Sequence, residues 1–162
     1  MIAAIVLSNR QNQLPVPAWV FPVFFVGMWL MITFLVSLTS GWRKLAEVYR
    51  ADQPFFGTRL SWQSASFRGT SYNNSLVLGV SNQGLHIVPM LLFRAFHPAL
   101  FIPWSEIVAT PVTMWKMVNL VEIRFQRVPD IPVRIRATVA AQLSEASLGQ
   151  FRVAAAATAR MS

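Results

Sequence analysis

The sequence of 162 residues contains no cysteine, which excludes disulfide bonds, cysteine metal ligands and thiol nucleophiles. Acidic residues are scarce as well, because the chain has only 6 Asp and Glu and none of them forms an evident pair for acid–base catalysis. Its two histidines, His86 and His97, have no partner at metal-ligand spacing. Neither a phosphate-binding glycine loop nor a nucleophile elbow occurs. We therefore expect neither an enzyme nor a bound cofactor or metal.

Charge is also missing from a long stretch near the N-terminus. Residues 16–38 (VPAWVFPVFFVGMWLMITFLVSL) contain no ionisable side chain. A helix of about 20 apolar residues spans the hydrocarbon core of a bilayer, so we predict a transmembrane helix over residues 16–40 after a short tail of residues 1–15. Trp19 would lie in the aromatic belt at one interface. The stretch is too long and too bulky for a cleavable signal peptide.

The charges that are present are mostly basic and follow this stretch. The chain has 14 Lys and Arg against 6 Asp and Glu, a net charge of +8, and Arg10 is its one charge before residue 43. Three cations come directly after the stretch, namely Arg43, Lys44 and Arg50. Cytoplasmic flanks of membrane helices carry the excess of Lys and Arg, so we predict a single pass with the C-terminal domain in the cytoplasm.

Residues 41–56 are predicted to form an amphipathic helix and a linker. Trp42, Leu45 and Tyr49 fall on one helical stripe, and Pro54 ends the pattern. In one interpretation Trp42 and Tyr49 lie at the membrane interface while the three cations contact lipid phosphate. In the other, the stripe packs on the chain's own domain. The sequence leaves both interpretations open.

From residue 57 the hydrophobic period changes to two, which predicts a β domain over residues 57–150. Seven short strands are expected, at residues 60–68, 72–80, 85–93, 100–109, 112–118, 120–127 and 131–136. A helix follows Thr138, with Val139 and Leu143 directed inward and Leu148 as a further candidate for that face. Residues 151–162 are alanine-rich and are expected to be a loose tail.

The phrases Gly84-Leu-His-Ile87 and Leu100-Phe-Ile-Pro-Trp-Ser-Glu-Ile107, with seven strands and a final helix, resemble PH-like and GRAM-like domains. With Gly41-Trp-Arg-Lys-Leu45, the whole chain is similar to bacterial single-pass inner-membrane proteins that carry such a domain. The resemblance implies a mainly-β PH-like split barrel of about seven antiparallel strands, with a C-terminal helix closing one open end. PH-like domains bind lipids or peptides or act as scaffolds. The basic loop of phosphoinositide-binding members would fall at residues 67–72, where this chain has only Arg68.

A basic strand face is the main candidate site within the domain. Strand alternation places Arg124, Arg134 and Arg136 opposite the inward residues. If the inward residues pair, Arg124 lies near Arg136 and Arg134 beside Gln126. Opposed like charges are destabilising, which indicates a nearby anion such as a lipid headgroup, Glu122 or an acidic partner. Alternatively, these arginines form a solvated face that prevents edge-to-edge aggregation.

We therefore predict a membrane-anchored binding or scaffolding module that presents this basic domain to a protein partner or to anionic lipid. An alternative is an accessory subunit of a larger membrane enzyme or transporter. A membrane-tethered enzyme would require a pocket that joins His86 or His97 to a carboxylate. Nucleic acid is not an expected partner. The sequence leaves the oligomeric state open, and the apolar stretch lacks a G-x-x-x-G pattern, so it suggests no helix dimer face.

Overall fold

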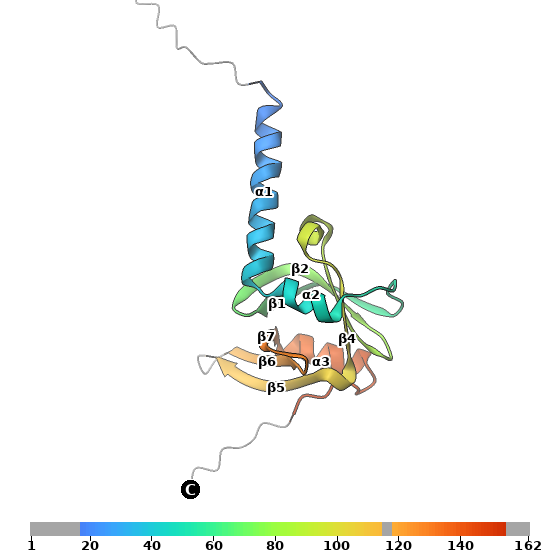
Figure 1. The fold of residues 1–162 in the computed structure, drawn as a ribbon. Helices are drawn as coiled ribbons and strands as arrows, with labels where there is room; N and C mark the ends of the chain where they lie inside the picture. The colour runs from blue at the N-terminus through green and yellow to red at the C-terminus, as the bar shows by residue number, and fades with distance from the viewer. Residues whose placement is uncertain (1–16, 115–117, 155–162) are drawn as a thin grey trace, which may run out of the picture.

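A computed structural model describes residues 17–114 and 118–154, so the predicted tail 1–15 lies outside the described residues. One long helix, α1 (Val20–Thr39), stands away from a β domain that contains the remaining elements (Figure 1). The predicted apolar N-terminal helix, the sheet of seven antiparallel strands and the C-terminal helix are all confirmed.

Helix α1 begins at Val20, whose N–H donates to the carbonyl oxygen of Pro17 at 2.8 Å. Pro22 lies in the first turn, where a missing N–H costs no helical hydrogen bond. This explains why the helix starts four residues after the predicted boundary at residue 16. In the part of the chain that the structure describes, α1 is the one helix long and apolar enough to cross a membrane.

Helix α2 (Trp42–Tyr49) follows at once and lies across the foot of α1 (Figure 1). Gly41 makes this turn with a φ of 75°, a left-handed conformation that glycine adopts without steric cost. Trp42, Leu45 and Tyr49 are buried in the core of the β domain. The second interpretation of this segment therefore holds. The placement of Trp42 and Tyr49 at the membrane interface is wrong, because protein surrounds both side chains.

The seven strands form one antiparallel sheet in the order β4-β3-β2-β1-β7-β6-β5. They are β1 (Thr58–Phe67), β2 (Thr70–Val80), β3 (Gly84–Pro89), β4 (Leu100–Pro103), β5 (Ile107–Met114), β6 (Val118–Phe125) and β7 (Val128–Arg136). Strand β1 is central because it pairs with both β2 and β7. Register shifts on either side of Gln63 bend this strand, and bulges of this kind increase strand twist.

Two predicted strand boundaries are corrected. The strand predicted over 85–93 ends at Pro89, and the chain leaves the sheet as a short 3-10 helix, η1 (Leu91–Phe96). The strand predicted over 100–109 is interrupted by η2 (Trp104–Glu106), which follows Pro103. Its first part is β4, and its last residues belong to β5, which continues into the region predicted as the strand 112–118. Proline lacks a backbone donor, so each of these two prolines ends a strand that the apolar pattern alone would extend.

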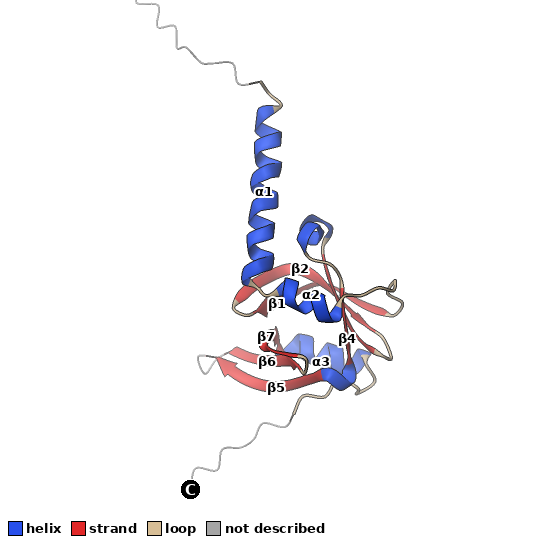
Figure 2. Ribbon diagram, viewed as in Figure 1, coloured by secondary structure: helices blue, strands red, loops and turns tan. Residues whose placement is uncertain are grey.

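The C-terminal helix α3 (Ala137–Ala146) packs against β6 and β7 through Val139 and Leu143 (Figure 2). Phe151 is also buried, and the N–H of Ala154 donates to the carbonyl oxygen of Ala109 in β5 at 2.8 Å. The domain therefore extends from α2 at least to residue 154, and the rest of the predicted loose tail 151–162 lies outside the described residues. Both predicted domain boundaries, at residues 57 and 150, exclude side chains that belong to the core.

Candidate functional site

A groove of about 700 Å³ lies where α1, α2 and η1 meet. Its charged side chains are Arg43, Glu47, Arg50 and Arg94. Its apolar side chains come from α1 and η1 and include Phe34, Leu38 and Phe96. We call this site the arginine groove. It combines cations with an apolar surface at the C-terminal end of α1.

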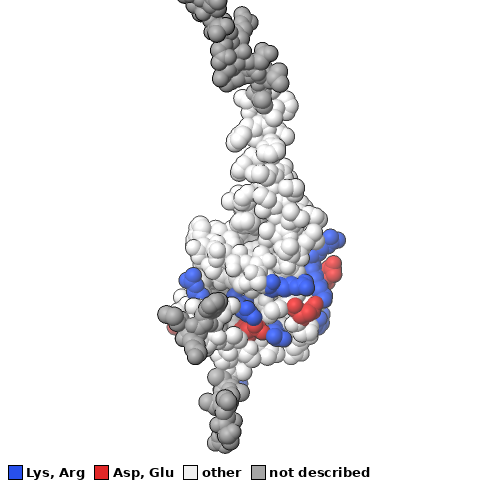
Figure 3. Space-filling model, turned by 90° about the vertical axis from the view of Figure 1, so that its left-hand side faces the viewer, with Lys and Arg blue, Asp and Glu red and all other residues white. Residues whose placement is uncertain are grey.

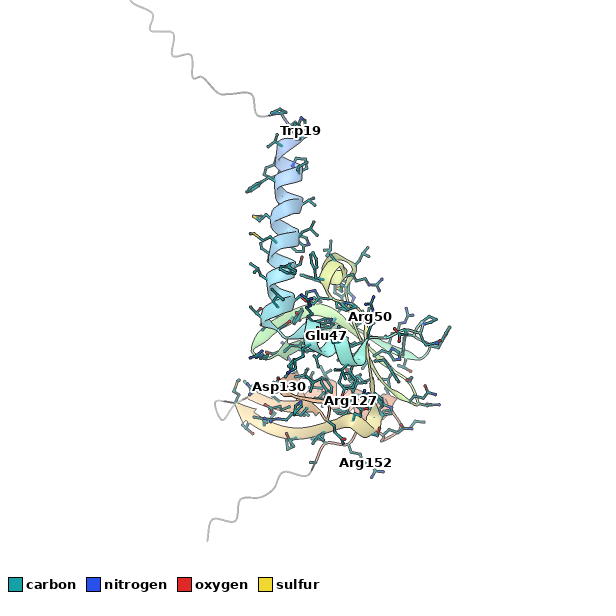
Figure 4. All side chains as sticks on the ribbon, in the orientation of Figure 1. Trp19, Glu47, Arg50, Arg127, Asp130 and Arg152 are labelled. Atoms are coloured by element: carbon teal, nitrogen blue, oxygen red, sulfur yellow. The ribbon has the colours of Figure 1, made fainter. Side chains whose placement is uncertain are left out.

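The helical period of α2 produces the polar wall of the groove. Arg43 and Glu47 are four positions apart, so they share one face of the helix, and Arg50 follows as its C-terminal cap in an extended conformation. The opposite face carries the buried stripe that fixes α2 in the core. Figure 4 shows Glu47 and Arg50 just below the foot of α1. The sequence predicted Arg43 and Arg50 as lipid-facing, and the structure places both of them here.

Arg94 is the groove residue that sequence reasoning missed. It belongs to η1, in a segment that the sequence pattern assigned to a strand and a turn. The available signal was the cation itself, which interrupts the apolar run of residues 91–96 directly after Pro89. In the fold, η1 brings this guanidinium to the same groove as Arg50, although 44 positions separate them in the sequence.

The groove has an excess of positive charge. Arg43 and Glu47 are 4.0 Å apart and both side chains are more than two-thirds exposed, so their attraction is weak. Among the residues that the structure describes, Arg50 and Arg94 form no ion pair. Figure 3 shows that the α1 rod has no charged surface and that Lys and Arg begin on the domain below it. An anion entering the groove would meet three cations and one carboxylate.

The basic strand face has a different register from the predicted one. Strand β7 pairs with β6 so that Arg134 lies opposite Glu122 and Arg136 opposite Leu120. The predicted approach of Arg124 to Arg136, and of Arg134 to Gln126, is therefore wrong. The cause is the turn, which is at Gln126 and Arg127 instead of at residues 128–131, together with a register shift between Ile123 and Phe125.

Glu122, one of the three anions that the sequence suggested, lies between Arg124 and Arg134. Its buried carboxylate accepts hydrogen bonds from Nε of Arg124 at 2.8 Å and Nε of Arg134 at 3.0 Å. Burial alone would raise the pKa of Glu122, but these two hydrogen bonds hold the pKa below its usual value. The arginines lie on the half of the sheet remote from α1 (Figure 1). They are not brought together with the arginine groove.

Lys44 and Tyr49 secure α2 to the rest of the domain. Lys44 pairs with Asp130 of β7, so it is not part of the groove. The hydroxyl of Tyr49 donates to Oε2 of Glu106 at 2.6 Å, and Arg127 donates two hydrogen bonds of 2.8 Å to the same carboxylate. Hydrogen bonds from Arg127 and then Tyr49 lower the pKa of Glu106. The buried Tyr49 and its bonds to Glu106 hold α2, and with it the groove, in position, while the exposed Lys44–Asp130 pair contributes little.

His97 is fully buried beside the junction of α1 and α2. Its Nε2 lies 2.8 Å from the hydroxyl of Tyr72, which lies 2.9 Å from Oγ of Ser40. Its Nδ1–H donates to the carbonyl oxygen of Phe93 at 2.9 Å. Burial lowers the pKa of His97. A neutral imidazole thus joins the end of α1 to β2 and η1, and a structural role accounts for all of its polar contacts.

His86 lines a cleft of about 660 Å³ that also contains Asp52. The ring of His86 packs between Phe55 and Phe101, each with a centroid distance of 4.6 Å, and no hydrogen bond joins it to Asp52. Burial lowers the pKa of His86. The described residues contain no group of three or more His, Asp and Glu side chains that could hold a metal ion. The arginine groove remains the best-supported candidate site.

Comparisons of the chain with protein-family models, with curated proteins and with solved structures find no match.

Proposed function

We propose that this chain is a single-pass inner-membrane protein whose PH-like domain is held at the cytoplasmic face and binds anionic phospholipid in the arginine groove. One observation carries the proposal: α1 continues without a flexible linker into α2, and α2 is part of the core of the domain. The groove is therefore fixed at the end of the apolar rod.

The dimensions of α1 support this arrangement. Its 20 residues give a length of about 30 Å, which equals the hydrocarbon thickness of a typical bilayer. If α1 spans the bilayer, the groove at its C-terminal end lies at the level of the lipid phosphates. Trp19 at the other end of the rod then lies at the opposite interface, as the sequence predicted (Figure 4).

The chemistry of the groove fits a phospholipid. Guanidinium groups bind phosphate oxygens through paired hydrogen bonds, and Arg50 and Arg94 are available for this. The neighbouring apolar side chains, Phe34, Leu38 and Phe96, would contact the first methylene groups of the acyl chains. A soluble anion would not need this apolar wall, so the combination favours a lipid.

The topology supports a PH-like split barrel. The strand order is that of two antiparallel half-sheets joined through the pairing of β1 with β7, and α3 follows β7. The two outer strands, β4 and β5, do not pair with each other. Helix α2 contacts both β4 and β7 and lies between the half-sheets (Figure 1). Such a domain serves as a binding module on a membrane surface, where tethering raises the effective concentration of its ligand.

The test measures lipid preference of the full chain in neutral detergent. We expect tighter binding of phosphatidylglycerol than of phosphatidylcholine, and a loss of this preference when Arg43, Arg50 and Arg94 are all changed to Gln. Each cation contributes about 1 kcal/mol near anionic lipid, so each substitution should weaken binding about fivefold. The matched control changes Arg68, Arg136 and Arg152 to Gln, which removes the same charge elsewhere.

Equal weakening by the two triple variants would reduce the effect to net charge and contradict a site in the groove. The control also examines the basic strand face, because Arg136 belongs to it. A chain that shows no lipid preference and purifies only with a second polypeptide would instead be an accessory subunit of a larger membrane complex.

A further inference from the structure

We infer that η1 is a second membrane-embedded element, a loop that enters the lipid leaflet beside α1 and contacts acyl chains. This inference rests on the proposed function, because it requires α1 to span the bilayer. The element rises from the β domain on the same side as α1 (Figure 1). Its tip carries Leu91 and Leu92, which are 79% and 69% exposed.

A stripe of α1 residues holds η1 in place. Trp29, Thr33 and Ser37 are spaced at i, i+4 and i+8, so they share the face of α1 that is directed toward η1. The indole N–H of Trp29 donates to the carbonyl oxygen of Leu92 at 3.2 Å, and Oγ of Ser37 donates to that of Phe96 at 2.9 Å. The ring of Trp29 also packs on Phe93, with centroids 5.6 Å apart.

These hydrogen bonds matter because non-helical backbone enters hydrocarbon only when its polar groups have partners. The carbonyl oxygens of Leu92 and Phe96 are satisfied by α1, and that of Phe93 by the imidazole of His97. Those of Met90 and Arg94 accept the N–H groups of Phe93 and His97. Five carbonyl oxygens of the loop are thus paired inside the protein, while the side chains of Leu91 and Leu92 are directed outward.

The depth of the loop follows from its contact with Trp29. This residue precedes the end of α1 at Thr39 by ten positions, which corresponds to about 15 Å along the helix axis and half of the hydrocarbon thickness. Leu92, which is bonded to Trp29, therefore reaches toward the middle of the bilayer. Arg94 lines the arginine groove together with Arg50, and its long side chain can extend its charge from the loop toward the headgroups.

The absence of cysteine from the chain permits a direct test with single-cysteine variants of the full-length protein. Leu92→Cys and Leu91→Cys report on the loop, Phe24→Cys on α1 and Arg152→Cys on the pole remote from α1 (Figure 4). Each variant is labelled with an environment-sensitive fluorophore and reconstituted into phosphatidylcholine–phosphatidylglycerol vesicles. Quenching by nitroxide on the acyl chain is then compared with quenching by aqueous iodide.

We expect acyl-chain nitroxide to quench the two loop labels within a factor of about two of the label at residue 24, because both regions lie in the hydrocarbon layer. Iodide should quench only the label at residue 152. If iodide quenches the loop labels while the α1 label stays protected, the loop lies outside the bilayer and the inference fails although the anchor stands. Protection of the loop labels from both quenchers would indicate a protein partner and would also overturn it. Iodide quenching of the α1 label would overturn the proposed function itself.

Discussion

At the scale of single residues, His97 places a titratable group where water cannot solvate its charge. Burial lowers the pKa of His97, and also that of His86, below the value near 6.5 of a free imidazole. Between the lowered pKa and 6.5 the unfolded chain binds protons that the folded chain does not bind. The free energy of unfolding therefore falls as pH drops below about 6.5. The contribution of the two neutral histidines to stability is fully retained above that pH.

Thermal unfolding of the full chain in detergent between pH 8 and 5 checks this prediction. The loss for each histidine is about 1.4 kcal/mol per unit by which its pKa is lowered. The double variant His86→Gln/His97→Gln should unfold at a lower temperature at pH 8, because contacts are lost, but with a flatter pH dependence. The lowered carboxylate pKa values, such as that of Glu106, act only below about pH 4.5 and do not interfere. If the unfolding temperature of the double variant depends on pH as steeply as that of the original chain, the two histidines are not the cause of the pH dependence.

At the scale of elements, α2 decides where the β domain begins. Leu45 is fully buried on one face of this helix and Glu47 is exposed on the other. Leu45→Ala should lower the free energy of unfolding by about 2–5 kcal/mol, as expected for a truncated core leucine. Glu47→Ala should change it by less than about 0.5 kcal/mol, since its ion pair is exposed. Denaturant unfolding in detergent measures both.

Similar small effects of the two substitutions would mean that α2 lies on the membrane surface, as in the interpretation that the structure does not support. For the same reason a fragment that starts at residue 57 should fail to fold, because it lacks Trp42, Leu45 and Tyr49 from the core. The shortest fragment expected to fold retains α2 and ends near residue 154.

The same elements explain what the sequence could and could not predict. The continuous apolar run identified α1, and the period of two identified the number of strands, because burial on one face of a strand imposes that period. It did not identify η1 or the division at η2, where Pro89 and Pro103 interrupt apolar runs. The pairing of Glu122 with Arg134 depends on the position of a single turn, and a displaced turn changes every cross-strand neighbour. The arginine groove joins three elements that only the tertiary fold brings together.

At the scale of the whole molecule, the distribution of charge predicts the orientation of the proposed transmembrane helix. Arg43, Lys44 and Arg50 follow the apolar stretch and Arg10 alone precedes it, so the domain should face the cytoplasm. Residue 152 lies on the part of the β domain remote from α1 (Figure 4), so it should be in the cytoplasm if the domain is. In a bacterial host, Arg152→Cys should therefore react with a membrane-impermeant maleimide only after lysis. Ser8→Cys should react in intact spheroplasts. The reverse result would place the arginine groove against the outer leaflet, and labelling of both positions in intact cells would contradict an inward-facing domain. Since α2 fixes the groove to α1, this one measurement decides which leaflet the proposed lipid site faces.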